Sequence, residues 1–169
     1  MTYRNLATLT ALLTVGCSGG TDAVMPPANA CMAILGSGET HGDRNKLMGT
    51  GTFTFDGVQR TGQVGLYLFE MRAASNGGYD VDTQYQFIWD NGDSFLTSDK
   101  VFFEPGLEPD LFRFKVRMTI VSGTGRFAGH VGEQPIALNA EIRFGPPPTP
   151  ADPKTADESF QINGSVCAP

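Results

Sequence analysis

The strongest constraint on the fold is a strict alternation of apolar and polar side chains between Leu111 and Val121, in the segment LFRFKVRMTIV. The apolar positions of one face are Phe112, Phe114, Val116, Met118 and Ile120. The basic residues Arg113, Lys115 and Arg117 occupy the opposite face. Because successive side chains of a β-strand point to opposite sides, this period predicts a strand with one buried face.

The same period of two returns along the chain after residue 30, where no segment carries apolar residues at helical spacing. Turn residues separate the alternating segments, and the Asn91-Gly92 pair is the strongest hairpin signal among them. We expect about eight strands, over residues 31–37, 46–55, 59–72, 83–90, 93–103, 111–122, 127–144 with an interruption near Pro135, and 159–167. Short antiparallel strands of even number with tight turns are typical of an all-β barrel or sandwich.

Residues 1–16 have the composition of a secretory signal. One positive charge, Arg4, precedes an uncharged stretch from Leu6 to Val15 that is rich in Leu, Ala and Thr. This stretch is shorter than the roughly 20 apolar residues that a helix needs to cross a bilayer. The segment therefore predicts export of the chain rather than a membrane span.

The leader ends in Thr14-Val15-Gly16-Cys17, which resembles the lipobox of bacterial lipoproteins, whose cysteine is diacylated and becomes the new N-terminus. We expect a lipid anchor at Cys17 that attaches the exported protein to a membrane, at the outer membrane or in the periplasm. Residues 17–30, with small side chains and two prolines, predict a flexible tether, and 31–169 a single β-domain. The alternatives are cleavage after Ala30 to give a secreted protein, and an uncleaved chain.

The chain contains three cysteines, and Cys17 is explained by the leader. Cys31 begins the expected domain, and Cys167 lies two residues from its end. An exported protein meets an oxidising compartment, so we expect a disulfide between these two residues that ties the first strand to the last. The alternative is a pair of buried free thiols.

The formal net charge of −6 and the isoelectric point near 4.8 argue against a nucleic-acid partner. No phosphate-binding loop, nucleophile motif or redox cysteine pair is present in the sequence, so no cofactor is predicted. His41 and His130 lie beside glycines and read as turn residues, so no metal site is predicted. The proline-rich residues 145–158 are expected to form an exposed loop, either a stiff spacer or a docking segment for an aromatic groove.

Residues 117–133, RMTIVSGTGRFAGHVGE, resemble the strand-turn-strand signature of the allene oxide cyclase-like and dirigent-like barrel families, Gly-Gly-Thr-Gly-Arg/Lys-Phe/Tyr-x-x-Ala-x-Gly. Ser122 stands where the first Gly is usual, and His130 where Ala is common. The resemblance implies a single antiparallel eight-stranded barrel, similar to a lipocalin, around a mainly apolar cavity. It does not select an activity, because function depends on the site rather than on the scaffold.

The candidate ligand-binding residues are of two kinds. Arg113, Lys115 and Arg117 would form an anion site if their face points into the barrel, and an ordinary solvated face if it points outward. Aromatic side chains that could surround a small apolar ligand inside a barrel include Tyr67, Phe87 and Trp89.

Three functions remain open: a lipid-anchored barrel that binds a small apolar or amphipathic ligand, a cyclase-like barrel enzyme, and a structural envelope protein with a filled barrel. A cavity would favour the first two, and titratable side chains inside it would favour catalysis. The sequence sets neither the ligand nor the oligomeric state.

Overall fold

The structure is a computed structural model, and it describes residues 31–145 and 155–168. The predicted leader over 1–16, the tether over 17–30 with Cys17, and most of the proline-rich segment lie outside the described residues. Within the described ranges, no helix is long and apolar enough to cross a membrane.

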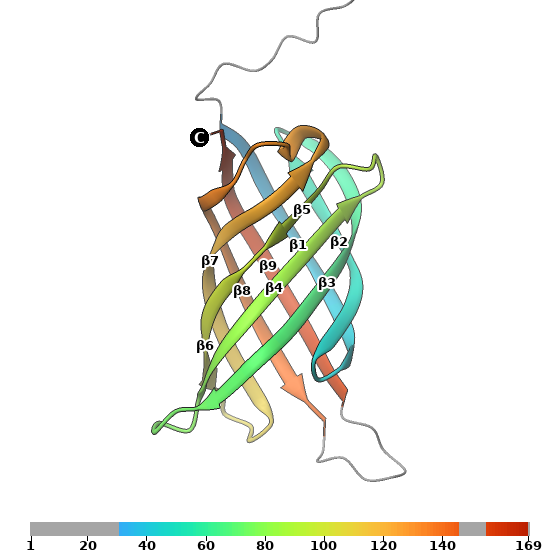
Figure 1. Cartoon of the computed structure of the whole chain (residues 1–169). Coiled ribbons are helices and arrows are strands. Elements are labelled where there is room, and N and C mark those ends of the chain that lie inside the picture. The colour runs from blue at the N-terminus through green and yellow to red at the C-terminus, as the bar shows by residue number, and fades with distance from the viewer. Residues whose placement is uncertain (1–30, 146–154, 169) are drawn as a thin grey trace, which may run out of the picture.

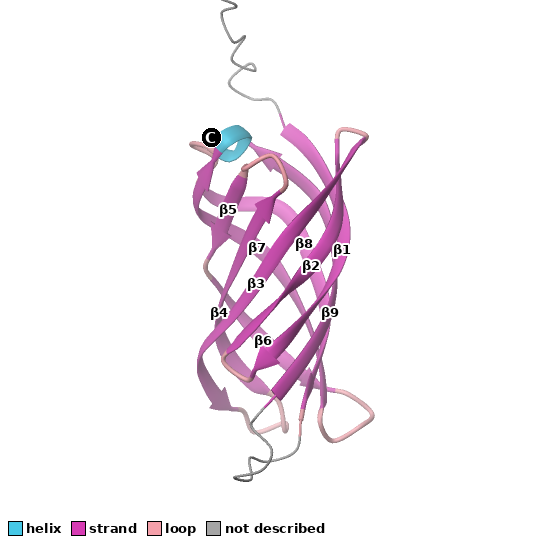
Figure 2. Cartoon of the chain, turned by 90° about the vertical axis from the view of Figure 1, so that its right-hand side faces the viewer, coloured by secondary structure: helices cyan, strands magenta, loops and turns pink. Residues whose placement is uncertain are grey.

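Nine antiparallel strands form one closed sheet (Figures 1 and 2). They are β1 (Cys31–Asp43), β2 (Lys46–Phe55), β3 (Val58–Ala73), β4 (Tyr79–Trp89), β5 (Ser94–Thr97), β6 (Asp99–Pro105), β7 (Leu111–Thr124), β8 (Gly132–Phe144) and β9 (Thr155–Cys167). The short strands β5 and β6 share one position in the wall, because both pair with β4 on one side and β7 on the other. The ring closes through β3 with β4 and β1 with β9. This confirms the all-β, eight-stranded antiparallel barrel.

Several predicted strands differ from the structure. β1 continues to Asp43 beyond the expected end at residue 37, so His41 lies on a strand and not in a turn. β4 begins at Tyr79, four residues early, and β9 begins at Thr155, inside the expected loop over 145–158.

The strand expected over 93–103 is interrupted at Ser98, whose N–H donates to the carbonyl of Thr119 on β7. The strand expected from residue 127 begins only at Gly132, because Gly125–Phe127 form a 3-10 turn, η1. Pro135 does not end β8, but it lies in a β-bulge: Ala137 pairs with Arg117 and Glu133 with Thr119, so Pro135 has no paired residue on β7 and its missing N–H is tolerated.

The core is a column of aromatic side chains inside the barrel. Along β7 the five apolar residues of the alternating segment are all buried, and the polar positions between them face outward. Ring contacts link Phe53, Phe87 and Phe160 through the middle, with centroids 5.7 to 6.4 Å apart. Gly38 is required opposite these rings, because a Cβ there would lie 2.6 Å from the ring of Phe160. Aromatic side chains therefore fill the middle of the barrel.

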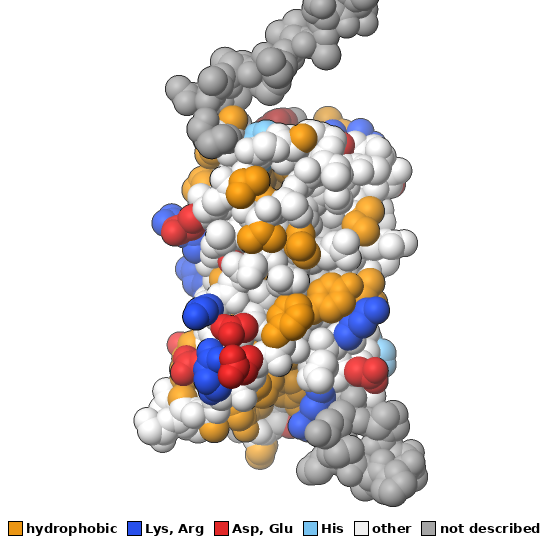
Figure 3. All heavy atoms as spheres, viewed as in Figure 1, with side chains coloured by type: hydrophobic (Ala, Val, Ile, Leu, Met, Phe, Trp, Pro, Cys, Tyr) orange, Lys and Arg blue, Asp and Glu red, His pale blue; other side chains and the backbone are white. Residues whose placement is uncertain are grey.

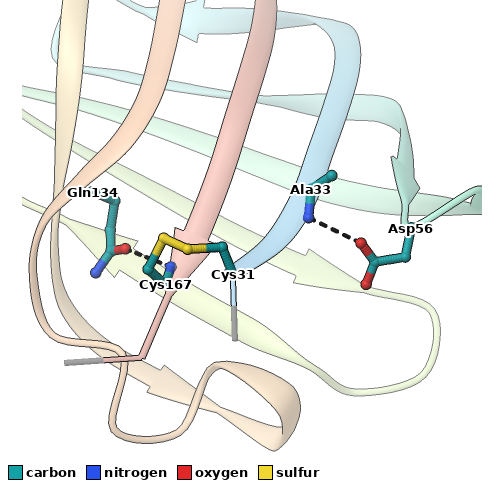
Figure 4. The surroundings of a disulfide bond; sticks show 5 residues. All are labelled: Cys31, Ala33, Asp56, Gln134 and Cys167. Atoms are coloured by element: carbon teal, nitrogen blue, oxygen red, sulfur yellow. Dashed lines mark hydrogen bonds between the residues drawn. A yellow bond between two sulfur atoms is a disulfide. The ribbon is translucent and has the colours of Figure 1, made fainter. Parts of the chain in front are cut away.

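A disulfide joins Cys31 to Cys167, as the sequence predicts (Figure 4). The two residues are directly opposite in the antiparallel register of β1 and β9, with their Cα atoms 4.0 Å apart. The N–H of Cys167 also donates to the side chain of Gln134 at 2.8 Å. These contacts fix the first and last described strands to each other at one end of the barrel.

Candidate ligand-binding site

The end of the barrel that carries the disulfide is closed by Phe127, which lies in η1 and is fully buried. Its ring packs against Trp89, Phe95 and Phe55, with centroids 4.9, 5.1 and 5.7 Å away. In Figure 1 this turn lies across the upper end of the barrel.

Asp93 holds the closing turn in place. Its carboxylate accepts hydrogen bonds from the backbone N–H of Arg126 at 3.2 Å and from the Arg126 guanidinium at 2.5 Å. Partial burial raises the pKa of Asp93, but hydrogen bonds from Asn91 and Arg126 outweigh it and keep that pKa below its ordinary value. Gly125 adopts a positive φ of 57°, and the space beside it is taken by the Asp93 carboxylate. This end of the barrel is therefore sealed by a specific contact.

The opposite end opens into a pocket of about 840 Å³. Its apolar lining comes from Leu68, Phe69, Met71, Tyr79, Pro109, Phe112 and Phe144. Asp43, Arg44, Asn45, Asp110 and Gly145 complete the wall. We call this space the mouth pocket. Its volume falls in the range of small-molecule sites, roughly 300 to 1,000 Å³, and its apolar lining with a few polar groups is typical of them.

Arg44 lies in the turn between β1 and β2 and contacts the end of β8, two strands away in the wall. One of its Nη atoms donates to the carbonyl of Gly145, which follows β8, at 2.8 Å. The guanidinium carbon lies 5.4 Å from the centre of the Phe144 ring, a cation–π distance. The turn is tied to β3 as well, since the N–H of Leu68 donates to the carbonyl of Asn45. These contacts place a positive charge against the apolar wall of the mouth pocket.

Glu158 is a buried carboxyl group on β9, two residues after Ala156 and on the same inward face. Glu158 is 3% exposed and accepts hydrogen bonds from the hydroxyls of Tyr85 and Thr40, the latter at 2.8 Å. Burial raises the pKa of Glu158 to about 7, although both hydrogen bonds favour the charged form. The pKa of Tyr85 is raised well above its ordinary value by burial and then by the charge of Glu158.

This carboxyl group is close to the mouth pocket. Glu158 pairs with Ile142, and the next inward pair toward the open end is Ala156 with Phe144, which lines the pocket. Two residues along a strand span about 6.6 Å. An acid that exchanges its proton near neutral pH therefore lies one layer beneath the pocket wall.

Asp99 is a second buried carboxyl group, located where β6 begins. One oxygen accepts from the N–H of Thr119 at 2.7 Å, and the other has no hydrogen-bond partner among the described residues. Burial raises the pKa of Asp99, against hydrogen bonds from Thr97 and Thr119. Its neighbour across the sheet is Thr83, two residues from Tyr85 on β4. Two carboxyl groups and a tyrosine are therefore buried in a mainly apolar interior.

The predicted basic row lies on the outside of the barrel. Arg113 pairs with Glu141 at 2.6 Å and Arg117 with Glu133 at 3.3 Å, while Lys115 is exposed between them. Because side chains alternate along a strand, the basic row must face outward: the residues between the basic ones, Phe114 and Val116, are buried in the core. The hypothesis of an inward anion site on β7 is therefore corrected: the row is a solvated face with cross-strand ion pairs.

The three predicted aromatic residues divide between the two faces. Phe87 and Trp89 are buried in the interior, in contact with Phe53 and the closing turn, and neither lines the mouth pocket. Tyr67 faces outward between the inward residues Leu66 and Leu68, with the Lys46 ammonium 5.8 Å from its ring. Figure 3 shows hydrophobic and charged side chains exposed together on the outside of the barrel. Tyr67 therefore does not line an interior site.

Within residues 31–145 and 155–168, no group of three or more His, Cys, Asp or Glu side chains is arranged to hold a metal ion. His41 contacts Asp157 on the outer face, where both side chains are mostly exposed. His130 contacts the backbone of its own turn.

Sequence reasoning missed Arg44, Glu158 and Tyr85 as site residues. Arg44 stands in a polar turn that has no periodic pattern. Glu158 could have been found, because it continues the inward phase of Phe160 and Ile162 on β9.

No protein-family model and no curated protein matches the chain. The solved structure of a pterocarpan synthase dirigent protein is similar to it, with 9% sequence identity and a TM-score of 0.33. That similarity covers 89% of this chain and 99% of the other. The chemistry of the site therefore rests on its own residues.

Proposed function

We propose that this chain is an exported barrel, anchored through Cys17, that binds a small apolar or amphipathic ligand in the mouth pocket. The observation that carries the proposal is the open, largely apolar pocket of about 840 Å³ at the end of the barrel opposite the disulfide. Because aromatic side chains fill the middle of the barrel, the ligand would occupy this open end and not a central cavity. Export and anchoring are supported by the N-terminal sequence and, for an oxidising compartment, by the disulfide.

Binding is tested with N-phenyl-1-naphthylamine, an uncharged fluorescent probe. The full chain carries Cys17→Ser in this test, because an acyl chain would compete for the pocket. We expect saturable fluorescence enhancement, weakened severalfold by Phe69→Ser, since Phe69 lines the pocket and is 64% exposed. Leu35→Ser is the matched control: Leu35 is 62% exposed and lies outside the pocket lining. Equal affinity in both variants, or no saturable binding, refutes the proposal.

The anchor is tested by mass spectrometry of the chain purified from bacterial membranes. We expect an N-terminal Cys17 carrying acyl groups, and a Cys17→Ser variant that leaves the membrane fraction. An unmodified N-terminus at Cys31 would refute anchoring and leave the ligand proposal intact.

A second candidate is catalysis by the same barrel, favoured by the hydrogen-bonded pair Glu158 and Tyr85 beneath the pocket. An acid with a pKa of about 7 can donate or accept a proton at neutral pH, which a cyclase-like rearrangement requires. To test this, wild-type protein and Glu158→Gln are each purified from the bacterium that naturally makes the protein, and the bound ligand is extracted from both. Catalysis predicts ligands of equal mass that elute differently, the variant retaining the unconverted isomer. Identical ligands support binding alone.

A further inference from the structure

Arg44 is the basic residue among those that line the mouth pocket. We infer that the ligand is an amphiphile with an anionic head group, whose head is bound by Arg44 and whose tail lies against the apolar pocket wall. This inference rests on the proposed function and specifies its ligand class.

The guanidinium of Arg44 has hydrogen-bonding capacity left over. It carries five N–H groups, and the described residues supply one acceptor, the carbonyl of Gly145 at 2.8 Å. Its Nε atom is buried and makes no hydrogen bond within the described part of the chain. A buried donor without an acceptor is costly. A carboxylate that accepts from Nε and a neighbouring Nη, once the side chain turns Nε toward the pocket, would remove that cost with two parallel hydrogen bonds.

The acidic side chains of the mouth do not neutralise Arg44. Asp110 is engaged by Arg143, with contacts of 3.1 and 3.2 Å, and Arg143 also binds Glu108 at 2.6 Å. Asp43 is exposed, and neither aspartate forms an ion pair with Arg44 among the described residues. Arg44 is therefore the cation of the pocket wall that has no carboxylate partner in this part of the structure.

The position of Arg44 separates a head site from a tail site. The guanidinium carbon lies 5.4 Å from the centre of the Phe144 ring, while Phe112 and Leu68 form apolar wall in the same pocket. A ligand whose charge meets Arg44 would thus place its apolar part against these side chains, where burial of apolar surface favours binding. A fully apolar ligand or a cation would leave the Nε donor of Arg44 unsatisfied, because neither carries an acceptor for it.

Arg60 provides an internal comparison. Its Nε is also buried without a partner, but it pairs with Asp90 at 3.5 Å and lies outside the mouth pocket lining. Loss of this guanidinium changes the overall charge by the same amount as loss of Arg44. Arg60→Met is therefore the matched control for Arg44→Met.

The experiment measures displacement of N-phenyl-1-naphthylamine from the Cys17→Ser full chain by three ligands with the same twelve-carbon tail: dodecanoate, dodecanol and dodecyltrimethylammonium. All are kept below their micelle concentrations. We expect dodecanoate to bind about tenfold more tightly than dodecanol, and the cation most weakly. Arg44→Met should remove the advantage of dodecanoate and leave dodecanol unchanged. Arg44→Lys should keep part of the advantage of dodecanoate over dodecanol, because lysine retains the positive charge but cannot form two parallel hydrogen bonds to a carboxylate.

Dodecanol binding as tightly as dodecanoate to wild type overturns the inference and leaves the proposed function standing. An equal loss of dodecanoate affinity in Arg60→Met and Arg44→Met overturns it as well, since a general charge effect would then suffice. Failure of the uncharged probe to bind wild type refutes the proposed function instead. The comparison of the three ligands on the protein without a change at Arg44 remains decisive even if Arg44→Met does not fold.

Discussion

The buried carboxyl group of Glu158 should make this barrel less stable as the pH rises, and Glu158→Gln should remove that dependence. The pKa of the folded state is about 7, against an ordinary value of 4.5. Between pH 4.5 and pH 7, Glu158 is therefore protonated in the folded protein and ionised in the unfolded chain. The stability that Glu158 contributes is fully present below pH 4.5 and is lost as the pH rises through 7.

The magnitude follows from the two pKa values. The difference between 7 and 4.5 is 2.5 pH units. At about 1.4 kcal/mol per unit this corresponds to about 3 kcal/mol in the free energy of unfolding, most of it lost between pH 5 and pH 8. Glutamine is a neutral mimic of the protonated acid and can still accept from Thr40. The variant should therefore match wild type at pH 5 and be more stable than wild type by about 2 to 3 kcal/mol at pH 8.

Urea denaturation of both proteins at pH 5 and pH 8 measures this difference directly. Other titrating groups are common to both proteins, so their effects cancel in the comparison. Glu141→Gln is the control, because Glu141 lies on the outer face of β8 and should show no such gain at pH 8. A wild-type-minus-variant difference that is the same at both pH values would refute a shifted carboxyl group.

Three further predictions concern the scaffold. Phe127→Ala should lower the free energy of unfolding by about 3 to 5 kcal/mol, because the ring is fully buried in the closed end; chemical denaturation measures this. Replacing Cys31 and Cys167 by Ser should remove about 4 to 5 kcal/mol, since the disulfide spans 136 residues, and a thermal melt with and without reductant should reproduce the loss in wild type. Arg113→Gln should leave the urea midpoint unchanged within error, because its ion pair with Glu141 is exposed to solvent; a large shift would mean that the row supports the fold.

The fold could be predicted from the sequence where one face of a strand is apolar and the other charged. On β7 the alternation predicted a strand with one buried face, and the structure shows that the apolar face is the buried one. On β3 both faces carry large apolar groups around Tyr67, so the phase was ambiguous. The interruption at Ser98 was invisible, because Phe95, Thr97, Asp99 and Val101 keep one inward phase through it.

The site was harder to predict than the fold. Glu158 follows a proline-rich segment and was assigned to a loop, although β9 begins at Thr155. The cation of the mouth pocket comes from a turn, and its role depends on Gly145 and Phe144, about 100 residues away in sequence. Such contacts follow from barrel closure, which no local pattern encodes.

The disulfide and the mouth pocket lie at opposite ends of the barrel. Cys31 and Asp43 are the two ends of β1, the first at the sealed end and the second in the mouth pocket. Twelve steps along a strand, tilted as in other barrels, correspond to an axial distance of about 30 Å. Cys31, where the described chain begins, and Cys167, near its end, therefore lie at the sealed end. A molecule that enters the mouth pocket approaches from the opposite end of the barrel.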